Sequence, residues 1–220
     1  MGKVLKGLYL FGNPHVGNSE VKKMYVGTDK VFPPYDAEIE YLESTGTQYI
    51  QLPLSVYKSS YFEVSGYFIP RNGTTFYGVM GANPYEQFSC EWYSSTNGYI
   101  MYTSRFGGQA GNGGWGGYEN VVTKFFISTE KIFSPTTETF IDNVRPLTGD
   151  INGFRVFGLY RNVALAPIAF CSVKIVVGKK TVYDLIPVRV GTTGYMYDKV
   201  SRQLFGNAGT GDFVLGNDVV

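Results

Sequence analysis

Apolar and polar residues alternate with a period of two along most of the chain, which is the pattern of strands that bury one face. The clearest such segments are 61–69, 74–81, 88–94, 98–104, 124–128, 154–160 and 173–178. Asn-Gly dipeptides at 72–73, 97–98 and 152–153 tolerate the positive φ angles of tight turns, and we expect them to separate strands. With no convincing helical segment, the pattern predicts an all-β, two-sheet antiparallel sandwich.

The first 35 residues follow a different pattern. Two short β-like pieces, KVLKGLYLFGNP and KKMYVGTDKVF, flank a polar segment, and Pro33-Pro34 then breaks the chain. Met24 to Val26 can return through a turn to Val31 and Phe32 as a hairpin. Since an isolated two-stranded hairpin is marginal in water, this unit must pack on something else. We therefore expect a small N-terminal β arm over 1–35 and one sandwich domain over 36–220.

Composition supports the all-β prediction and limits the kinds of partner that we expect. The 220 residues include 18 Tyr, 16 Phe and 28 Gly, a balance that favours strands and tight turns. A formal net charge of +1 offers no broad basic field for nucleic acid. The most apolar stretch, Val163 to Val173, is too short to span a bilayer and contains Pro167, and the N-terminus lacks the apolar run of a signal peptide. We expect neither a nucleic-acid nor a membrane partner.

Few residues are suited to metal binding or redox chemistry. Cys90 and Cys171 lie in strand-like segments and are predicted to be two buried free thiols, with a disulfide between them as the alternative. His15, the one histidine, cannot build a zinc site by itself. Calcium would need clustered oxygens, but the candidates match no loop signature and suit turns better: Asp142, Asn143, Asp150 and Asn152. We predict no metal and no cofactor.

Two longer segments resemble a known domain. AEIEYLESTGTQYIQLPL (37–54) and VYDLIPVRVGTTGYMYDKVSRQLFGNAGTGDFVLG (182–216) resemble the two ends of a laminin-G-like, concanavalin A-like lectin-fold domain found in tailed-phage virion proteins and in surface proteins of gut bacteria. Between them, ETFIDNVRPL (138–147) resembles a hairpin of that fold, in which a short turn joins two strands. FRVFGLYRNV (154–163) and FCSVKIVVGKKTVYDLIPVR (170–189) are similar to its penultimate strands. The resemblance covers about 37–216 and implies an antiparallel jelly-roll sandwich.

A short segment of the arm also resembles segments of known proteins. KKMYVGTDKVFPP is similar to β segments that open many phage tail and head-associated proteins. Together, the two resemblances imply a non-enzymatic structural protein on the surface of the virion, forming a capsid decoration, a head fibre or part of a tail fibre. The arm would dock on other virion proteins, and homo-oligomers are expected. Its apolar residues would make that contact by strand addition: Leu8, Leu10, Met24, Val26, Val31 and Phe32.

The end motifs also have physical interpretations of their own. Tyr41 and Tyr49 lie on either side of Ser-Thr-Gly, so the chain is expected to fold back at Gly46 as two strands whose aromatic rings enter the core. Asp198 suits a turn, flanked by apolar residues on both sides. Asn207 and Gly209 then permit a second reversal. These residues are predicted to specify the fold.

An enzymatic alternative rests on Glu38, Glu40 and Glu43. Their E-x-E-x-x-E spacing is close to the E-x-D-x-x-E of lectin-fold glycoside hydrolases, and carboxylates two apart on a strand face the same side, as a nucleophile and its acid must. The catalytic strand of those enzymes lies in mid-chain, whereas this segment opens the domain, and the middle Asp is replaced by Glu. We therefore expect no enzymatic activity.

The loop GGQAGNGGWGGY (107–118) is the candidate for ligand binding. It lacks the lysine and the following helix of a phosphate-binding loop. A sugar site would combine an aromatic face with polar groups, which this region supplies as Trp115, Tyr118, Arg105, Gln109 and Asn112. A mobile connection whose Trp115 covers a sheet edge is the simpler interpretation. A free or surface-displayed carbohydrate-binding protein, adhering to host or mucosal glycans, is thus the alternative to the virion protein.

Overall fold

The computed structural model describes residues 15–16, 19–20, 24–26, 29–71, 76–77, 79–81, 89–93, 98–104, 108–110, 120–134, 139–142, 150–157 and 168–219. The chain divides into two compact units, Met1–Asp36 and Ala37–Val220. Every regular element in the described residues is a β-strand, as the alternating pattern predicted. No helix among them is long and apolar enough to cross a membrane.

The N-terminal unit contains two short antiparallel ribbons. Strand β1 (His15–Val16) pairs with β2 (Ser19–Glu20), and β3 (Met24–Val26) pairs with β4 (Asp29–Phe32). In the second ribbon Met24 lies opposite Phe32, so the predicted hairpin is confirmed. Leu8 and Leu10 fall outside the described residues, as do the side chains of Val26 and Val31. The docking role of the arm therefore stays a prediction.

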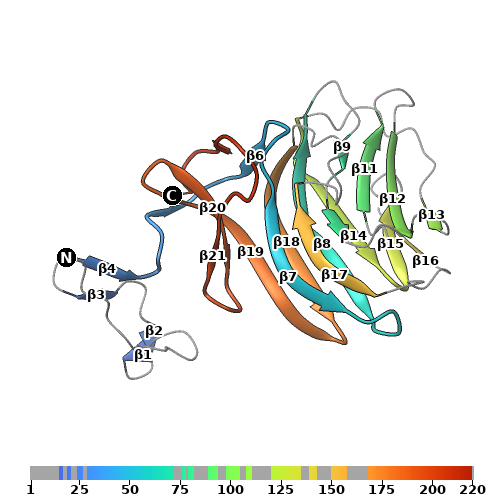
Figure 1. The fold of residues 1–220 in the computed structure, drawn as a ribbon, viewed down its shortest axis with the longest axis horizontal. Coiled ribbons are helices and arrows are strands. Elements are labelled where there is room, and N and C mark those ends of the chain that lie inside the picture. The colour runs from blue at the N-terminus through green and yellow to red at the C-terminus, as the bar shows by residue number, and fades with distance from the viewer. Residues whose placement is uncertain are drawn as a thin grey trace. The chain divides into compact units, whose positions relative to one another are not determined.

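The second unit is built around one large antiparallel sheet of 11 strands (Figure 1). Its main path is β16-β15-β14-β8-β18-β19-β20-β21, with β5 beside β19 and β6 between β18 and β22. The bounds are β5 (Ala37–Glu38), β6 (Leu42–Ser44), β8 (Phe62–Pro70), β14 (Thr123–Ser128), β15 (Lys131–Ser134), β16 (Thr139–Asp142), β18 (Ile168–Val177), β19 (Lys180–Val190), β20 (Thr193–Asp198), β21 (Leu204–Phe205) and β22 (Val214–Leu215).

Two smaller sheets complete the unit. One has the order β10-β17-β7 and the other the order β13-β12-β11-β9. Their strands are β7 (Ile50–Val56), β9 (Phe76–Tyr77), β10 (Val79–Gly81), β11 (Ser89–Tyr93), β12 (Gly98–Ser104), β13 (Gly108–Ala110) and β17 (Ile151–Val156). Figure 1 shows β7 and β17 lying over the large sheet, which gives the two layers of the predicted sandwich.

The core lies between these layers and follows from alternation along each strand. In β7 the side chains of Ile50, Leu52, Leu54 and Val56 are buried, while those between them are exposed. Aromatic rings join the layers: Phe154 of β17 meets Phe62 of β8 edge to face, with centroids 5.8 Å apart. The core list is Ile39, Leu42, Ile50, Leu52, Leu54, Val56, Phe62, Val64, Phe68, Phe125, Ile127, Ile151, Phe154, Val156, Phe157, Ile168, Phe170, Val173, Ile175, Leu185, Met196 and Phe213.

Gly66 shows why one position in β8 cannot carry a side chain. The register between β8 and β18 shifts between Phe170 and Ser172, which leaves Cys171 as an extra residue in a bulge. A Cβ at Gly66 would collide with the carbonyl oxygen of Ser172 and touch the ring of Phe125. Glycine therefore lets the bulged strand approach β8 closely.

The turn predicted at Asn152-Gly153 is wrong. Asn152-Gly153 does not separate strands but lies within β17, where the register against β7 shifts and Gly153 has a φ of 81°. Pro53 and Leu54 of β7 lie opposite Gly153 alone, so the dipeptide is at a β-bulge, where a positive φ is equally suited. The strand predicted at 154–160 accordingly begins earlier, at Ile151. Asn72, Gly73 and Asn97 lie outside the described residues.

The predicted hairpin at Gly46 is also wrong. Strand β6 pairs with β18 and β22 in the large sheet, whereas β7 pairs with β17 in the other layer, so the chain crosses between layers at this point. Tyr41 and Tyr49 are only partly buried, and each ring lies beneath an arginine: Arg71 at 5.1 Å and Arg155 at 4.2 Å from the ring centroids. Leu42 and Ile50 enter the core instead.

The cysteine prediction holds in part. Cys171 carries a free thiol, but the residue is half-buried in the bulge of β18 and not fully buried as expected. Burial raises the pKa of this thiol, which lowers the fraction present as the reactive thiolate. The side chain of Cys90 lies outside the described residues.

Candidate functional site

The candidate functional surface is the face of the large sheet that points away from the core, here called the outer face. In β14 the side chains of Phe125 and Ile127 are buried in the core, so Lys124 and Phe126 lie on the opposite face. The same alternation in β8 places Tyr67 on the outer face. Strand geometry therefore positions these residues, and the register between neighbouring strands sets which of them adjoin.

Three phenylalanines form a row across β14, β15 and β16, here called the Phe row: Phe126, Phe133 and Phe140. Phe133 pairs directly with Phe140, and the pairing of Ile127 with Ile132 puts Phe126 beside Phe133. The ring of Phe140 lies 5.0 Å from that of Phe126 and 5.4 Å from that of Phe133, centroid to centroid. Phe140 is 49% exposed at the last strand of the sheet path, whereas Phe126 is partly buried and Phe133 is 9% exposed, so Phe140 carries most of the accessible surface of the row.

Lys124 borders the Phe row on one side. Its ammonium nitrogen lies 4.7 Å from the ring centroid of Phe133 and 5.5 Å from that of Phe140, within range of a cation–π attraction. Tyr67 is opposite Lys124 in the pairing of β8 with β14, and it is 47% exposed. This side of the row thus offers one cation and one amphipathic ring.

Charges of both signs border the other side of the Phe row. Lys131 pairs with Asp142 across β15 and β16, and Glu63 of β8 lies opposite Ser128 of β14. The Tyr61 hydroxyl donates a 2.6 Å hydrogen bond to Glu63. Burial, together with this bond and the charge of Glu63, raises the pKa of Tyr61 to about 12. Two carboxylates and one ammonium therefore face Lys124 across the row.

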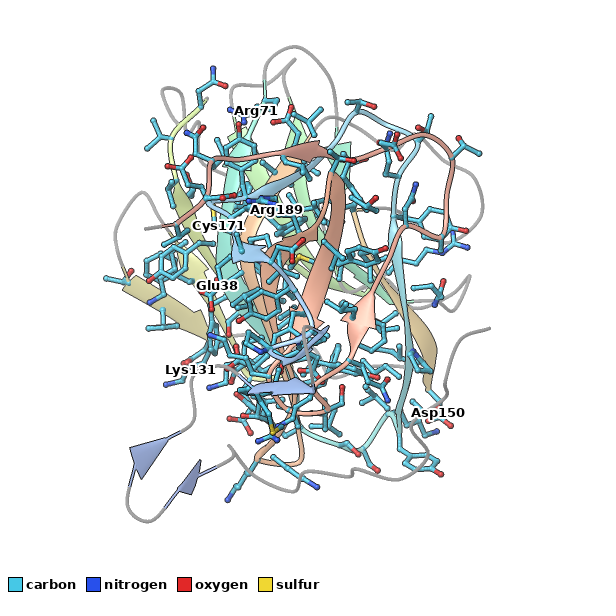
Figure 2. The ribbon with its side chains drawn as sticks, turned by 90° about the vertical axis from the view of Figure 1, so that its left-hand side faces the viewer. Glu38, Arg71, Lys131, Asp150, Cys171 and Arg189 are labelled. Atoms are coloured by element: carbon cyan, nitrogen blue, oxygen red, sulfur yellow. The ribbon has the colours of Figure 1, made fainter. Side chains whose placement is uncertain are left out.

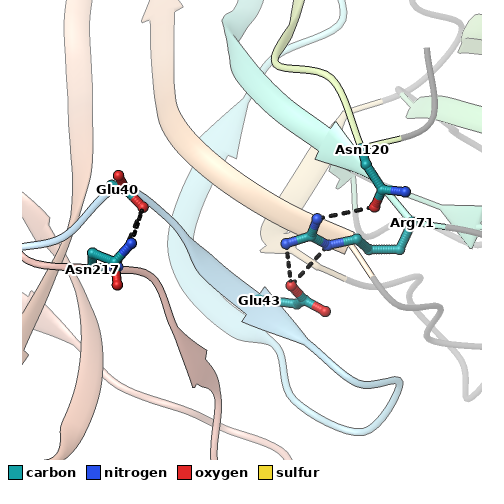
Figure 3. A network of polar contacts seen from close by, with 5 residues as sticks. All are labelled: Glu40, Glu43, Arg71, Asn120 and Asn217. Atoms are coloured by element: carbon teal, nitrogen blue, oxygen red, sulfur yellow. Dashed lines mark hydrogen bonds and ion pairs between the residues drawn. The ribbon is translucent and has the colours of Figure 1, made fainter.

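Toward one end of the outer face, Arg71 holds three segments together (Figures 2 and 3). Its Nε and Nη2 atoms donate to the same oxygen of Glu43, at 2.8 and 2.6 Å, and Nη1 donates to Asn120 at 3.1 Å. The guanidinium also covers the ring of Tyr41. Both charged side chains are largely shielded, at 22% and 17% exposure. Figure 2 shows Arg71 and Lys131 at opposite ends of the domain.

The carboxylates of the E-x-E-x-x-E segment have separate structural partners. Glu43 is held by Arg71, while Glu40 accepts hydrogen bonds from the backbone and side-chain nitrogens of Asn217 at 3.4 and 3.1 Å. Figure 3 shows the two carboxylates directed to these different partners. Glu38 ends β5, and its carbonyl accepts a backbone bond from Val219. This arrangement gives the segment a role in joining strands.

The two end motifs contact each other in a structure here called the clasp, residues 44–49 and 207–212. Gln48 is 3% exposed, and its Oε1 atom accepts from Thr45 N at 2.8 Å and Ser44 Oγ at 3.2 Å. Its Nε2 atom donates to the carbonyl of Asp212 at 2.9 Å. Asn207 Oδ1 accepts from Tyr49 N, which fastens the start of β7. The chain bends at residues 208–211, where Gly209 N donates to Asn207 Oδ1 at 2.8 Å, so Asn207 has a turn-forming role at the position where a second reversal was predicted.

Asp198 organises the turn between β20 and β21, as its sequence position predicted. The residue is fully buried, and its carboxylate accepts three backbone N–H bonds, from Asp184 and Ser201 at 2.8 Å and from Val200 at 3.1 Å. The bond from Asp184 reaches the neighbouring strand β19. One side chain thus closes a hairpin and ties it to the sheet.

The predicted sugar site cannot be placed. Arg105, Asn112, Trp115 and Tyr118 lie outside the described residues, and Gln109 is placed only as a backbone partner of Tyr102. Glycan binding by this loop stays a prediction. Within the described ranges no cluster of three or more potential metal ligands occurs. Of the four calcium candidates, Asp150 accepts a backbone bond at 2.8 Å from Lys58, which lies 92 residues away in the β7–β8 loop, so this contact does not test the turn-forming role that we expect for it.

Sequence reasoning missed the outer face, although the signal was present. The segment KFFIS was recognised as a strand, and its two adjacent phenylalanines must point to opposite faces. One of them is therefore outside the core. No family model, no curated protein and no solved structure matches the chain.

Proposed function

We propose that the protein is a non-enzymatic structural component of a phage virion, in which the N-terminal arm attaches a jelly-roll, laminin-G-like sandwich to other virion proteins. The sandwich is then displayed on the particle surface. The resemblance of the end motifs and of KKMYVGTDKVFPP supplies the class of protein. The physical support comes from how the two units are built.

The observation that carries the proposal is the contrast between the two units. The strands described in the arm are two to four residues long and pair only as ribbons, which are marginal without a partner. The sandwich has its own core, and backbone bonds hold its two ends together: Val219 N donates to Glu38 O, and Glu40 N donates to Asn217 O, both at 2.9 Å. A self-contained domain with a short β arm suits attachment by strand addition.

The absence of enzymatic activity belongs to the same proposal. The carboxylates with the best spacing for glycoside hydrolysis are occupied in joining strands, and the ion pair of Glu43 with Arg71 opposes its use as a nucleophile or proton donor. Glu43→Gln is therefore expected to alter stability, with no polysaccharide hydrolysed by either protein. Hydrolysis by the wild type that is lost in Glu43→Gln would contradict this.

Size-exclusion chromatography with light scattering tests the attachment role of the arm. The full chain is compared with residues 36–220, whose folding is checked by circular dichroism. We expect the full chain to form a larger assembly than the truncated domain, and Val31→Asp in the arm to reduce it. The matched control is Val200→Asp, at an exposed valine of the sandwich, which should leave the assembly unchanged. Equal assembly of the full and truncated chains would overturn the proposal.

A further inference from the structure

The Phe row raises a question that the proposed attachment role does not answer. Phe126 and Phe140 point away from the core, and Phe140 keeps half of its surface exposed although it lies in a regular strand. Phe126 is partly buried and Phe133 is 9% exposed, so Phe140 and the nearby Tyr67 supply most of the accessible aromatic surface of this face. Exposed aromatic surface of this kind commonly marks a contact with another molecule. Its three rings already hold one another in edge-to-face or tilted contacts, so little side-chain freedom would be lost on binding.

We propose that the outer face around the Phe row is the interface between two copies of this chain, related by a two-fold axis. The inference goes beyond the proposed attachment to a virion and does not depend on it. It concerns a surface of the sandwich and not the arm.

The distribution of charged residues around the Phe row favours a second copy of the chain as the partner. Lys124 lies on one side of the Phe row, and Glu63, Lys131 and Asp142 lie on the other, where negative charge is in excess. A two-fold rotation about an axis along the row places row on row and exchanges the two sides. Lys124 of each copy then faces the side that carries Glu63 and Asp142 in the other copy. The pattern is thus self-complementary, as an isologous interface requires.

Sheet geometry is compatible with this arrangement. The axis runs across the strands, so β14, β15 and β16 of one copy lie antiparallel to their counterparts in the other. Two such faces pack in the aligned manner, with strand directions within about 30° of each other. Aromatic residues form the centre, and Tyr67, Lys124 and Asp142 form a polar rim, which is the usual composition of a specific interface.

Sedimentation velocity of the full chain, from micromolar to hundreds of micromolar concentration, provides the test. We expect a monomer–dimer equilibrium, and Phe140→Ser should raise its dissociation constant about 10-fold or more, because the most exposed aromatic ring of the row is lost. The control is Tyr57→Ser, at a side chain 71% exposed in the β7–β8 loop, which should change the constant less than about 2-fold.

Charge variants test the orientation. Lys124→Glu and Glu63→Lys should each weaken the dimer, because the axis brings Lys124 of one copy beside Glu63 of the other and each variant places like charges there. The double variant should recover most of the affinity, an outcome that a merely structural role of either residue does not predict. Lys124 is exposed and Glu63 is partly exposed, so these variants keep the test valid even if Phe140→Ser fails to fold.

Three results would overturn the interface. The first is a full chain that stays monomeric over the whole concentration range. The second is a dimer that responds to neither Phe140→Ser nor the charge variants. The third is an assembly abolished by Val31→Asp and insensitive to every outer-face variant, which would leave the arm proposal standing and remove this one.

Discussion

The clasp and the Phe row place polar and apolar residues in opposite ways. In the clasp the side chain of Gln48 is buried and each of its polar atoms is hydrogen-bonded, whereas in the Phe row the ring of Phe140 is half exposed. A buried amide is tolerated because its partners are fixed by two segments 164 residues apart in the chain. An exposed phenylalanine gains nothing comparable in the single chain. The comparison indicates that the clasp specifies the fold and the Phe row serves recognition.

Among the contacts that specify the fold, the largest loss is expected at Asp198, in the turn that precedes the clasp. Asp198→Ala removes the buried carboxylate that accepts from three partly buried N–H groups, and we expect the free energy of unfolding to fall by about 3 kcal/mol. Denaturant unfolding measures this change. Asp212→Ala, at an exposed aspartate of the clasp, is the control and should stay within about 0.5 kcal/mol of wild type.

Gln48→Ala should have the next largest effect. It removes the acceptor of Thr45 N and the donor to Asp212 O, and an expected loss of about 2 kcal/mol follows from the unpaired backbone groups. Gln51→Ala removes the same side chain from the exposed face of β7, where it accepts from Arg155. Equal losses in the two variants would contradict the role given to the clasp.

Two arginine pairs sharpen the comparison between shielded and exposed contacts. Arg71→Lys breaks a fork to Glu43 that is largely shielded from water, so we expect a loss of about 1 kcal/mol. Arg189→Lys breaks a fork to both carboxylate oxygens of Asp218, whose side chain is 46% exposed, and should lower the stability less than Arg71→Lys does. Urea titration of both variants, repeated at high salt, ranks the two pairs.

The smallest effect concerns pH. The pKa of Tyr61 is raised to about 12, above the value near 10 of an unfolded tyrosine, so the folded state binds this proton more tightly. Its contribution is present below about pH 10 and is lost as pH rises toward 12. Tyr61→Phe should remove this part of the pH dependence of unfolding, and Tyr57→Phe should retain it. Parallel curves for all three proteins would argue against the raised pKa.

Much of the fold was predictable because alternation decides which face of a strand is buried. Strand β12 was predicted to the residue, and the turn at Asp198 and the hairpin from Met24 were confirmed. Pairing between distant segments was not predictable from local pattern. Gly46 looks like a hairpin turn, yet β6 and β7 belong to different layers because the C-terminal segment pairs with β6.

The residues of the outer face were harder to predict from the sequence, again because pairing between strands decides which residues lie side by side. A phenylalanine in a strand counts toward the core in any composition-based argument, and only the register shows that Phe126, Phe133 and Phe140 share the face opposite to Ile127. Likewise, the spacing of Glu38, Glu40 and Glu43 is close to a catalytic motif. The partners of Glu40 and Glu43, which are Asn217 and Arg71, lie too far along the chain for the spacing to reveal them.

The most direct test of the division between fold and recognition is sedimentation velocity on Phe140→Ser and Gln48→Ala, run beside denaturant unfolding of the same samples. The account predicts that Phe140→Ser weakens the dimer about 10-fold while its unfolding free energy changes by less than about 1 kcal/mol. Gln48→Ala should show the reverse, with lower stability and an unchanged dimer. A Phe140→Ser protein that dimerises like wild type, or a Gln48→Ala protein as stable as wild type, would contradict the account.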